Sequence, residues 1–133
     1  MIFAILALAL TACTASPTAP APTSQVDAAQ LGPNVDVATV NGLLGRDDVL
    51  ILDVREQSEY DAGHIPGVTL IPLNDVPKRL NEIPKDKPVI VTCRSGNRSG
   101  QATDFLRQQG YTNVHNMTGG INAWQQAGYA VEK

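Results

Sequence analysis

Residues 88–99 read PVIVTCRSGNRS, an apolar run that ends in a cysteine and a short loop with one glycine and two arginines. A continuous run of apolar, β-branched residues is typical of a strand covered on both faces. The stretch that follows (99–110) places Ala102 and Leu106 at helical spacing and ends in a glycine, which predicts an amphipathic helix. The segment is therefore expected to form a strand, a loop and a helix, with Cys93 at the end of the strand.

The same alternation extends over most of the chain and predicts the fold class. Strands are expected at 49–54, 68–71, 88–92 and 113–117, and helices after Asp36, at 56–60, 75–83, 99–110 and 119–128. Strands that alternate with helices predict a single α/β domain with a mainly parallel central sheet and helices on both faces. Ligands of such sheets bind beyond the carboxyl ends of the strands, and Cys93 is predicted to lie at that edge.

Composition narrows the classes of function. The chain has 133 residues, is 43% hydrophobic and 17% charged, and carries a formal net charge of −3, as expected of one ordinary globular domain. Its mild acidity argues against a general nucleic-acid binder, so no nucleic-acid partner is expected. Two cysteines and two histidines provide neither a disulfide framework nor a zinc ligand set. We expect no metal site and no cofactor.

The N-terminus predicts export. The apolar run in MIFAILALALTAC (1–13) is too short to span a bilayer as a helix but suits the core of a signal peptide. Residues 10–13, LTAC, resemble the lipobox of bacterial lipoproteins, in which the signal is cut before the cysteine and the cysteine is acylated. No Lys or Arg precedes the run, which departs from the usual positively charged start. A conventional cleaved signal and a hydrophobic N-terminus without function are the alternatives.

On the lipoprotein interpretation, residues 1–12 are the signal peptide and Cys13 is the lipid anchor. Residues 13–33 have four prolines, no aromatic residue and a single charge, which predicts an extended tether to a domain at 34–133. Several acyl chains would anchor stably, since each buried methylene contributes about 0.8 kcal/mol. The protein is then exported and held at a bacterial cell membrane, on its periplasmic or extracellular face. A small domain on a tether is most simply a monomer.

The loop after Cys93 has the features of an anion site. Gly96 permits a positive φ, which lets successive amides turn inward as a nest. The helix that follows adds its positive N-terminal end. Arg94 and Arg98 add full charges, and the segment 87–103 contains no acidic residue. These effects lower the pKa of a thiol and make it reactive, and an inert structural cysteine would not need them.

The spacing of the loop separates two chemistries. Cysteine phosphatases carry Cys-x5-Arg, a loop wide enough to wrap a phosphoryl group. Here Arg98 follows Cys93 after four residues, one fewer. A tighter ring leaves less room for a tetrahedral phosphate and suits a single extra sulfur atom on the cysteine. The spacing favours sulfur transfer over phosphoryl transfer.

Three motifs give the chain a resemblance to a known family over roughly residues 34–131. They are DVREQSEYDAGHIPGV (53–68), CRSGNRS (93–99) and GGINAW (119–124). Together they resemble the single-domain rhodaneses, a family of thiosulfate-type sulfurtransferases. The resemblance implies a rhodanese-like domain without a cofactor.

The resemblance also implies a mechanism and a set of site residues. Cys93, as the catalytic nucleophile, would take a sulfane sulfur from a small anionic donor such as thiosulfate and hold it as a persulfide. Cyanide, a cellular thiol or a thioredoxin-like protein would then accept the sulfur. With Cys13 acylated, no second thiol of the chain could take it. The substrate-binding residues would be Arg94, Ser95, Gly96, Asn97, Arg98 and Ser99.

Alternatives remain for the function and for the residues around the loop. A persulfide or redox carrier, or a module that binds a partner at the loop, is the main one, and a cysteine-dependent phosphatase is the lesser one. His64 is predicted to be structural, because a thiolate stabilised by its loop needs no general base. Asp53 and Arg55 could shape the donor site, or Arg55 could pair with Glu56 or Glu59.

Overall fold

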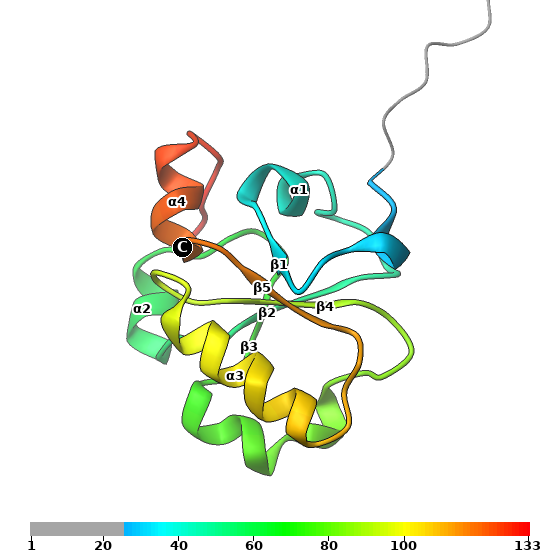
Figure 1. The fold of residues 1–133 in the computed structure, drawn as a ribbon. Helices are drawn as coiled ribbons and strands as arrows, with labels where there is room; N and C mark the ends of the chain where they lie inside the picture. Colours follow the sequence, from blue (N-terminus) through cyan, green and yellow to red (C-terminus); the bar gives the residue numbers. More distant parts are fainter. Residues whose placement is uncertain (1–25) are drawn as a thin grey trace, which may run out of the picture.

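Five parallel strands form the centre of the molecule, in the order β1-β5-β4-β2-β3 (Figure 1). The computed structural model describes residues 26–133, so the predicted signal peptide, Cys13 and the first part of the tether lie outside the described residues. Every pairing in the sheet is parallel. The strands are β1 (Asn34–Val35), β2 (Leu50–Asp53), β3 (Thr69–Leu70), β4 (Val89–Thr92) and β5 (Val114–Met117).

Helices cover both faces of this sheet. The α-helices are α1 (Val37–Asn41), α2 (Gln57–Ala62), α3 (Asn97–Gln108) and α4 (Gly120–Gln126). Short 3-10 helices are η1 (Ala28–Gln30), η2 (Leu73–Lys78) and η3 (Leu80–Glu82). In Figure 1, α1 and α4 lie on one side of the sheet and α3 with η2 on the other. The predicted α/β class, with a parallel sheet between helices, is confirmed.

The position of β4 in the sheet explains why Val89, Ile90 and Val91 form an apolar run. The strand pairs with β2 on one side and β5 on the other. Val89 and Val91 pack in the same cluster as Leu106 of α3, whereas Ile90 packs in the cluster of Trp124 on the opposite face. Successive side chains of a strand point to opposite faces, so a strand covered on both faces needs an unbroken apolar run. This central position delivers Cys93 to the middle of the sheet's carboxyl edge.

The segment 75–83 differs from the predicted helix. It forms parts of the 3-10 helices η2 and η3, separated at Arg79. Pro77 lies inside η2. A proline has no N–H and disrupts an α-helical interior, whereas short 3-10 turns need only a few hydrogen bonds.

The packed domain begins before the predicted boundary at residue 34. Ala28 is buried, and Val26 and Leu31 pack against the same core cluster. The guanidinium of Arg46 donates to the carbonyl oxygen of Val26 at 2.8 Å. Because β1 pairs with β5 at the edge of the sheet, the residues just before β1 lie close to the domain and pack against its core. Residues 26–33 are therefore part of the globular unit.

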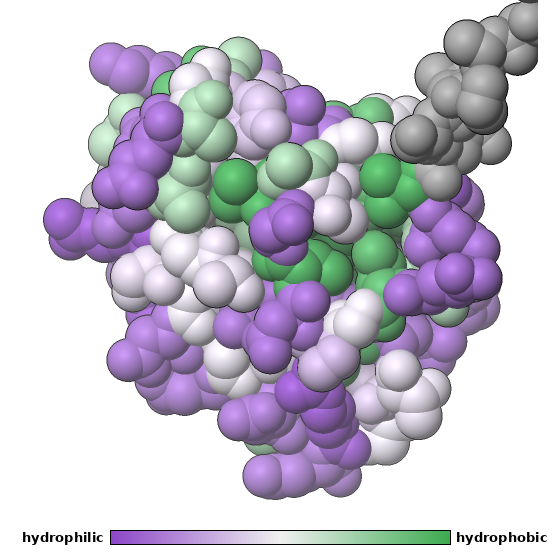
Figure 2. All heavy atoms as spheres, turned by 45° about the horizontal axis from the view of Figure 1, so that its top comes forward, coloured by the Kyte–Doolittle hydropathy of each residue, from purple (hydrophilic) through white to green (hydrophobic). Residues whose placement is uncertain are grey.

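Figure 2 shows the face formed by α1, α4 and the start of the described chain, where apolar side chains lie partly uncovered among polar ones. The largest exposed fraction among large apolar side chains of residues 26–133 belongs to Val131, at 38%. None of the helices in this part of the chain has the length and apolar character needed to cross a membrane.

Candidate active site

Cys93 is the first residue after β4, and its side chain is only 1% exposed. Gly96 has a φ of +96°, a left-handed conformation that turns the chain from the loop into α3. The amide of Gly96 donates to the Cys93 sulfur at 3.1 Å, and the hydroxyl of Ser99 donates to it at 3.3 Å. The nest expected from the glycine thus forms around the sulfur itself.

These donors change the acidity of the thiol. Burial raises the pKa of Cys93, but hydrogen bonds from the Ser99 hydroxyl and from the amides of Ser99, Ser95 and Gly96 lower it. The net pKa lies below the ordinary value for a cysteine. Hydrogen bonds to the charged form of an acid favour that form. The loop therefore stabilises a thiolate, which is the nucleophilic state of cysteine.

The first turn of α4 fixes the other side of the loop. The amide of Ile121 donates to the carbonyl of Cys93 at 2.8 Å, and the amide of Asn122 donates to the carbonyl of Arg94 at 3.1 Å. Gly120 has a φ of +57°, and a Cβ at this position would collide with the Cys93 carbonyl and lie 2.6 Å from the Arg94 carbonyl oxygen. The second glycine of GGINAW, a motif found in the sequence only through the resemblance, thus permits the close approach of two backbones.

Arg98 is engaged by an acidic residue from another helix. Its guanidinium donates to both carboxylate oxygens of Glu59 on α2, at 2.6 and 2.8 Å. The hydrogen bond from Arg98 is the largest cause that lowers the pKa of Glu59, to about 2. The sequence around the loop contains no acidic residue, but the fold brings one to it. No local pattern could have revealed Glu59, because 39 positions separate it from Arg98.

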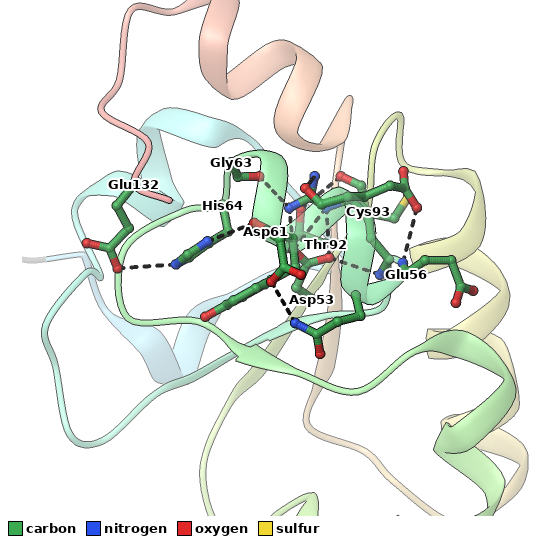
Figure 3. Close-up of polar contacts among 12 residues, drawn as sticks. Asp53, Glu56, Asp61, Gly63, His64, Thr92, Cys93 and Glu132 are labelled. Carbon is green, nitrogen blue, oxygen red and sulfur yellow. Dashed lines mark hydrogen bonds and ion pairs between the residues drawn. The ribbon is translucent and has the colours of Figure 1, made fainter.

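Arg55 has a different partner from those expected. It forms a buried ion pair with Asp53 at 2.8 Å, with side chains 5% and 2% exposed. Its remaining donors reach the carbonyls of Gly63 at 2.9 Å and Glu59 at 3.2 Å. Pairing with the side chain of Glu56 or Glu59, one of the two alternatives for Arg55, does not form, because Asp53, two residues away, presents both of its oxygens. Asp53, the last residue of β2, pairs in the sheet with Thr92 of β4, the residue before Cys93, and Figure 3 labels all three.

The other predicted loop residues face outward. Arg94, Ser95 and Asn97 are exposed, and the side chain of Asn97 accepts a hydrogen bond from Gln101 at 2.9 Å. Arg94 lines a hollow beside the loop. Its guanidinium forms no ion pair within residues 26–133. The hollow is also lined by Arg55, Glu59, Gly63, Asn122 and Gln125, among others.

His64 contacts the C-terminal segment of the chain and helps to hold it in place. Its ring stacks on Tyr60 with centroids 3.7 Å apart, and its Nδ1 lies 2.9 Å from the carbonyl of Tyr60. Its backbone pairs with Glu132, whose carboxylate lies 3.4 Å from Nε2 (Figure 3). These contacts fit the predicted structural role. Within residues 26–133, no three potential metal-ligating side chains of the His, Cys, Asp or Glu types gather into a group.

The fold and the loop define a class of protein: a parallel α/β domain with a cysteine sulfur held among hydrogen-bond donors at the carboxyl edge of its sheet. The chain belongs to the rhodanese-like domain family, whose sequence model matches residues 36–127.

Individual relatives agree with this membership. A sulfurtransferase of Allochromatium vinosum is 45% identical over 89 residues, which are 67% of this chain and 83% of that protein. The thiosulfate sulfurtransferase GlpE of Pseudoalteromonas translucida is 35% identical over 94 residues, 71% of this chain and 90% of that protein. The crystal structure of a rhodanese-related protein from Thermoplasma volcanium superposes with a TM-score of 0.69 at 32% identity, covering 76% of this chain and 98% of that one.

The hydroxyl of Ser99 gives a first prediction. Ser99→Ala removes a hydrogen bond to the sulfur, so the pKa of Cys93 is expected to rise. The pH dependence of iodoacetamide alkylation, followed by mass spectrometry on the peptide that contains Cys93, measures this shift. Ser95→Ala is the matched control, because Ser95 reaches the sulfur only through its amide. Equal profiles for the two variants would show that the hydroxyl does not stabilise the thiolate.

Gly120 gives a second prediction. Gly120→Ala should slow alkylation of Cys93, because the new Cβ displaces the loop carbonyls of Cys93 and Arg94. Gly128→Ala is the control, since Gly128 also has a positive φ of 80° but nothing lies within 4 Å of a Cβ there. A left-handed non-glycine residue costs about 1–2 kcal/mol at either site, which thermal unfolding records. If Gly128→Ala slows alkylation as much, strain rather than contact is responsible.

Proposed function

We propose that this protein is a sulfurtransferase that carries a sulfane sulfur as a persulfide on Cys93. The observation that carries the proposal is the set of hydrogen-bond donors aimed at a buried sulfur within a short loop. These donors stabilise a negative charge on sulfur, either as thiolate or as persulfide anion. The names of two relatives, a sulfurtransferase and a thiosulfate sulfurtransferase, support the same chemistry.

The reaction proceeds by two displacements at sulfur. The Cys93 thiolate attacks the outer sulfur of thiosulfate, the sulfur–sulfur bond of the donor breaks, and sulfite leaves with its electron pair. An acceptor nucleophile then attacks the outer sulfur of the persulfide, and the Cys93 thiolate leaves. With cyanide the product is thiocyanate, and with a thiolate it is a new persulfide. Covalent catalysis of this kind divides one transfer into two easier steps.

The loop residues have separable roles in this scheme. The amides of residues 94–98 cradle the persulfide, and Arg94 attracts the anionic donor from the hollow that it lines. Ser95 and Asn97 lie at the exposed mouth of the loop. A small thiol or a thioredoxin-like protein is the acceptor that we propose. An acylated Cys13 leaves no second thiol in the chain to accept the sulfur.

Turnover of thiosulfate and cyanide tests this function. The reduced protein should form thiocyanate, Cys93→Ser should abolish the activity, and Cys13→Ser, which removes the other thiol, should retain it. The activity is measured by the colour of the iron–thiocyanate complex. Turnover that survives Cys93→Ser would refute the proposal. Cys93-dependent hydrolysis of an aryl phosphate instead would indicate a phosphatase, and a persulfide passed only to one protein would indicate a carrier.

We further propose that the protein is exported and anchored through a lipid on Cys13. The support is the LTAC sequence at 10–13 after an apolar run. In bacteria, the protein should fractionate with membranes, and mass spectrometry should find acyl mass on an N-terminal Cys13. Cys13→Ser should release it from the membrane fraction. Wild-type protein recovered in the aqueous fraction with an unmodified Cys13 would contradict the anchor.

A further inference from the structure

Glu59 joins three parts of the active site although it touches no reacting atom. Its carboxylate accepts both hydrogen bonds of the Arg98 fork and one from the amide of Glu56 at 3.1 Å. Its carbonyl accepts from Arg55, just after β2. The residue therefore ties the beginning of α2 to the end of β2 and to the first turn of α3.

We propose that Glu59 is a positioning residue: it holds Arg98, and with it the first turn of α3, so that the loop's donors stay aimed at the Cys93 sulfur. In this account Arg98 serves the geometry of the loop, and Arg94 is the arginine that meets the donor. The inference deepens the proposed function and rests on it for turnover, whereas the reactivity of the thiol tests it independently.

The beginning of α3 needs such a tie. The N-cap of α3 is Gly96, which has no capping side chain, so the Cys93 sulfur is the acceptor for amides at this end, and the first turn contains no acidic residue. Helices are usually fixed at this end by a side-chain cap or an acidic group. Arg98 is in that first turn, next to Ser99, whose hydroxyl lies 3.3 Å from the sulfur. A loss of the Glu59 tie would therefore loosen the residues that donate to Cys93.

The charges in the site support this division between the two arginines. The charge of Arg98 is neutralised by a bidentate ion pair with Glu59, and the charge of Arg55 by a buried ion pair with Asp53. Within residues 26–133, Arg94 has no such partner. An anionic donor in the hollow is attracted to the uncompensated charge, because binding at Arg98 would first require separation from Glu59. A planar fork held by both carboxylate oxygens is a strong and oriented contact.

The test replaces Glu59 with an isosteric amide. Glu59→Gln should raise the pKa of Cys93 in the alkylation profile and lower kcat for thiosulfate about tenfold or more, as loss of precise positioning does, with KM for thiosulfate unchanged. Asp61→Asn is the matched control, because it removes an exposed carboxylate of the same helix, one whose hydrogen bond is with Gln57, without touching Arg98 or Glu59. This control should behave as the wild type.

The sign of the pKa change separates positioning from simple electrostatics. If the loop stayed in place, loss of the Glu59 charge would leave Arg98 uncompensated near the sulfur and lower the pKa of Cys93. A lowered pKa would therefore overturn the proposal, as would a changed KM at constant kcat. If the protein transfers no sulfur, the alkylation profile still decides the role of Glu59, so failure of the proposed function is distinguished from failure of this inference.

The variant Arg98→Lys provides a second test of the positioning role of Glu59. It keeps the charge but loses the fork, since a lysine is a point charge without two parallel donors. The variant should share the defect of Glu59→Gln, and the double variant should be no worse than either single one, because both changes break one contact. Thermal unfolding confirms that all variants are folded at the assay temperature. Wild-type reactivity in Arg98→Lys, or additive losses in the double variant, would contradict the positioning role.

Discussion

The proposed chemistry requires a buried sulfur to carry a negative charge, and this is the constraint on which the account of the site depends. Burial in an apolar cluster disfavours a thiolate, and Cys93 packs among the residues of the core. Donors within hydrogen-bond distance of the sulfur offset this cost, and they come from its own loop, from Gly96 and Ser99. The left-handed turn at Gly96 and the hydrogen bonds from the start of α4 hold the loop that carries these donors.

Ion pairs hold the surroundings of the loop without adding much net charge. Asp53 compensates Arg55 at the end of β2, and Glu59 compensates Arg98 at the start of α3. Buried charges are tolerated when they are paired and fully hydrogen-bonded, and the guanidinium of Arg55 meets both a carboxylate and two carbonyls. On the proposed function, the attraction for an anionic donor is therefore left to the loop amides and Arg94. In this arrangement the paired arginines, Arg55 and Arg98, hold the structure of the site, whereas Arg94, which has no ion pair within residues 26–133, supplies its net positive charge.

The sequence predicted what depends on neighbouring residues. The apolar run of β4 placed Cys93 at the edge of a parallel sheet, and Gly96 indicated the nest, because both signals lie within a few positions. The sequence did not predict contacts between segments that lie far apart in the chain. Glu59 is 39 positions from Arg98, and only the fold shows that Gly120 must be small to lie against the Cys93 carbonyl. Pro77 signalled a departure from α-helix that periodicity alone did not reveal.

The mass of the peptide that contains Cys93 after treatment with thiosulfate is the most direct test of the account. We predict a gain of one sulfur atom on Cys93, its absence in Cys93→Ser, and its loss when cyanide is added with formation of thiocyanate. An unchanged mass in the fresh, reduced protein would contradict the central claim. A sulfur found on another residue would contradict it equally.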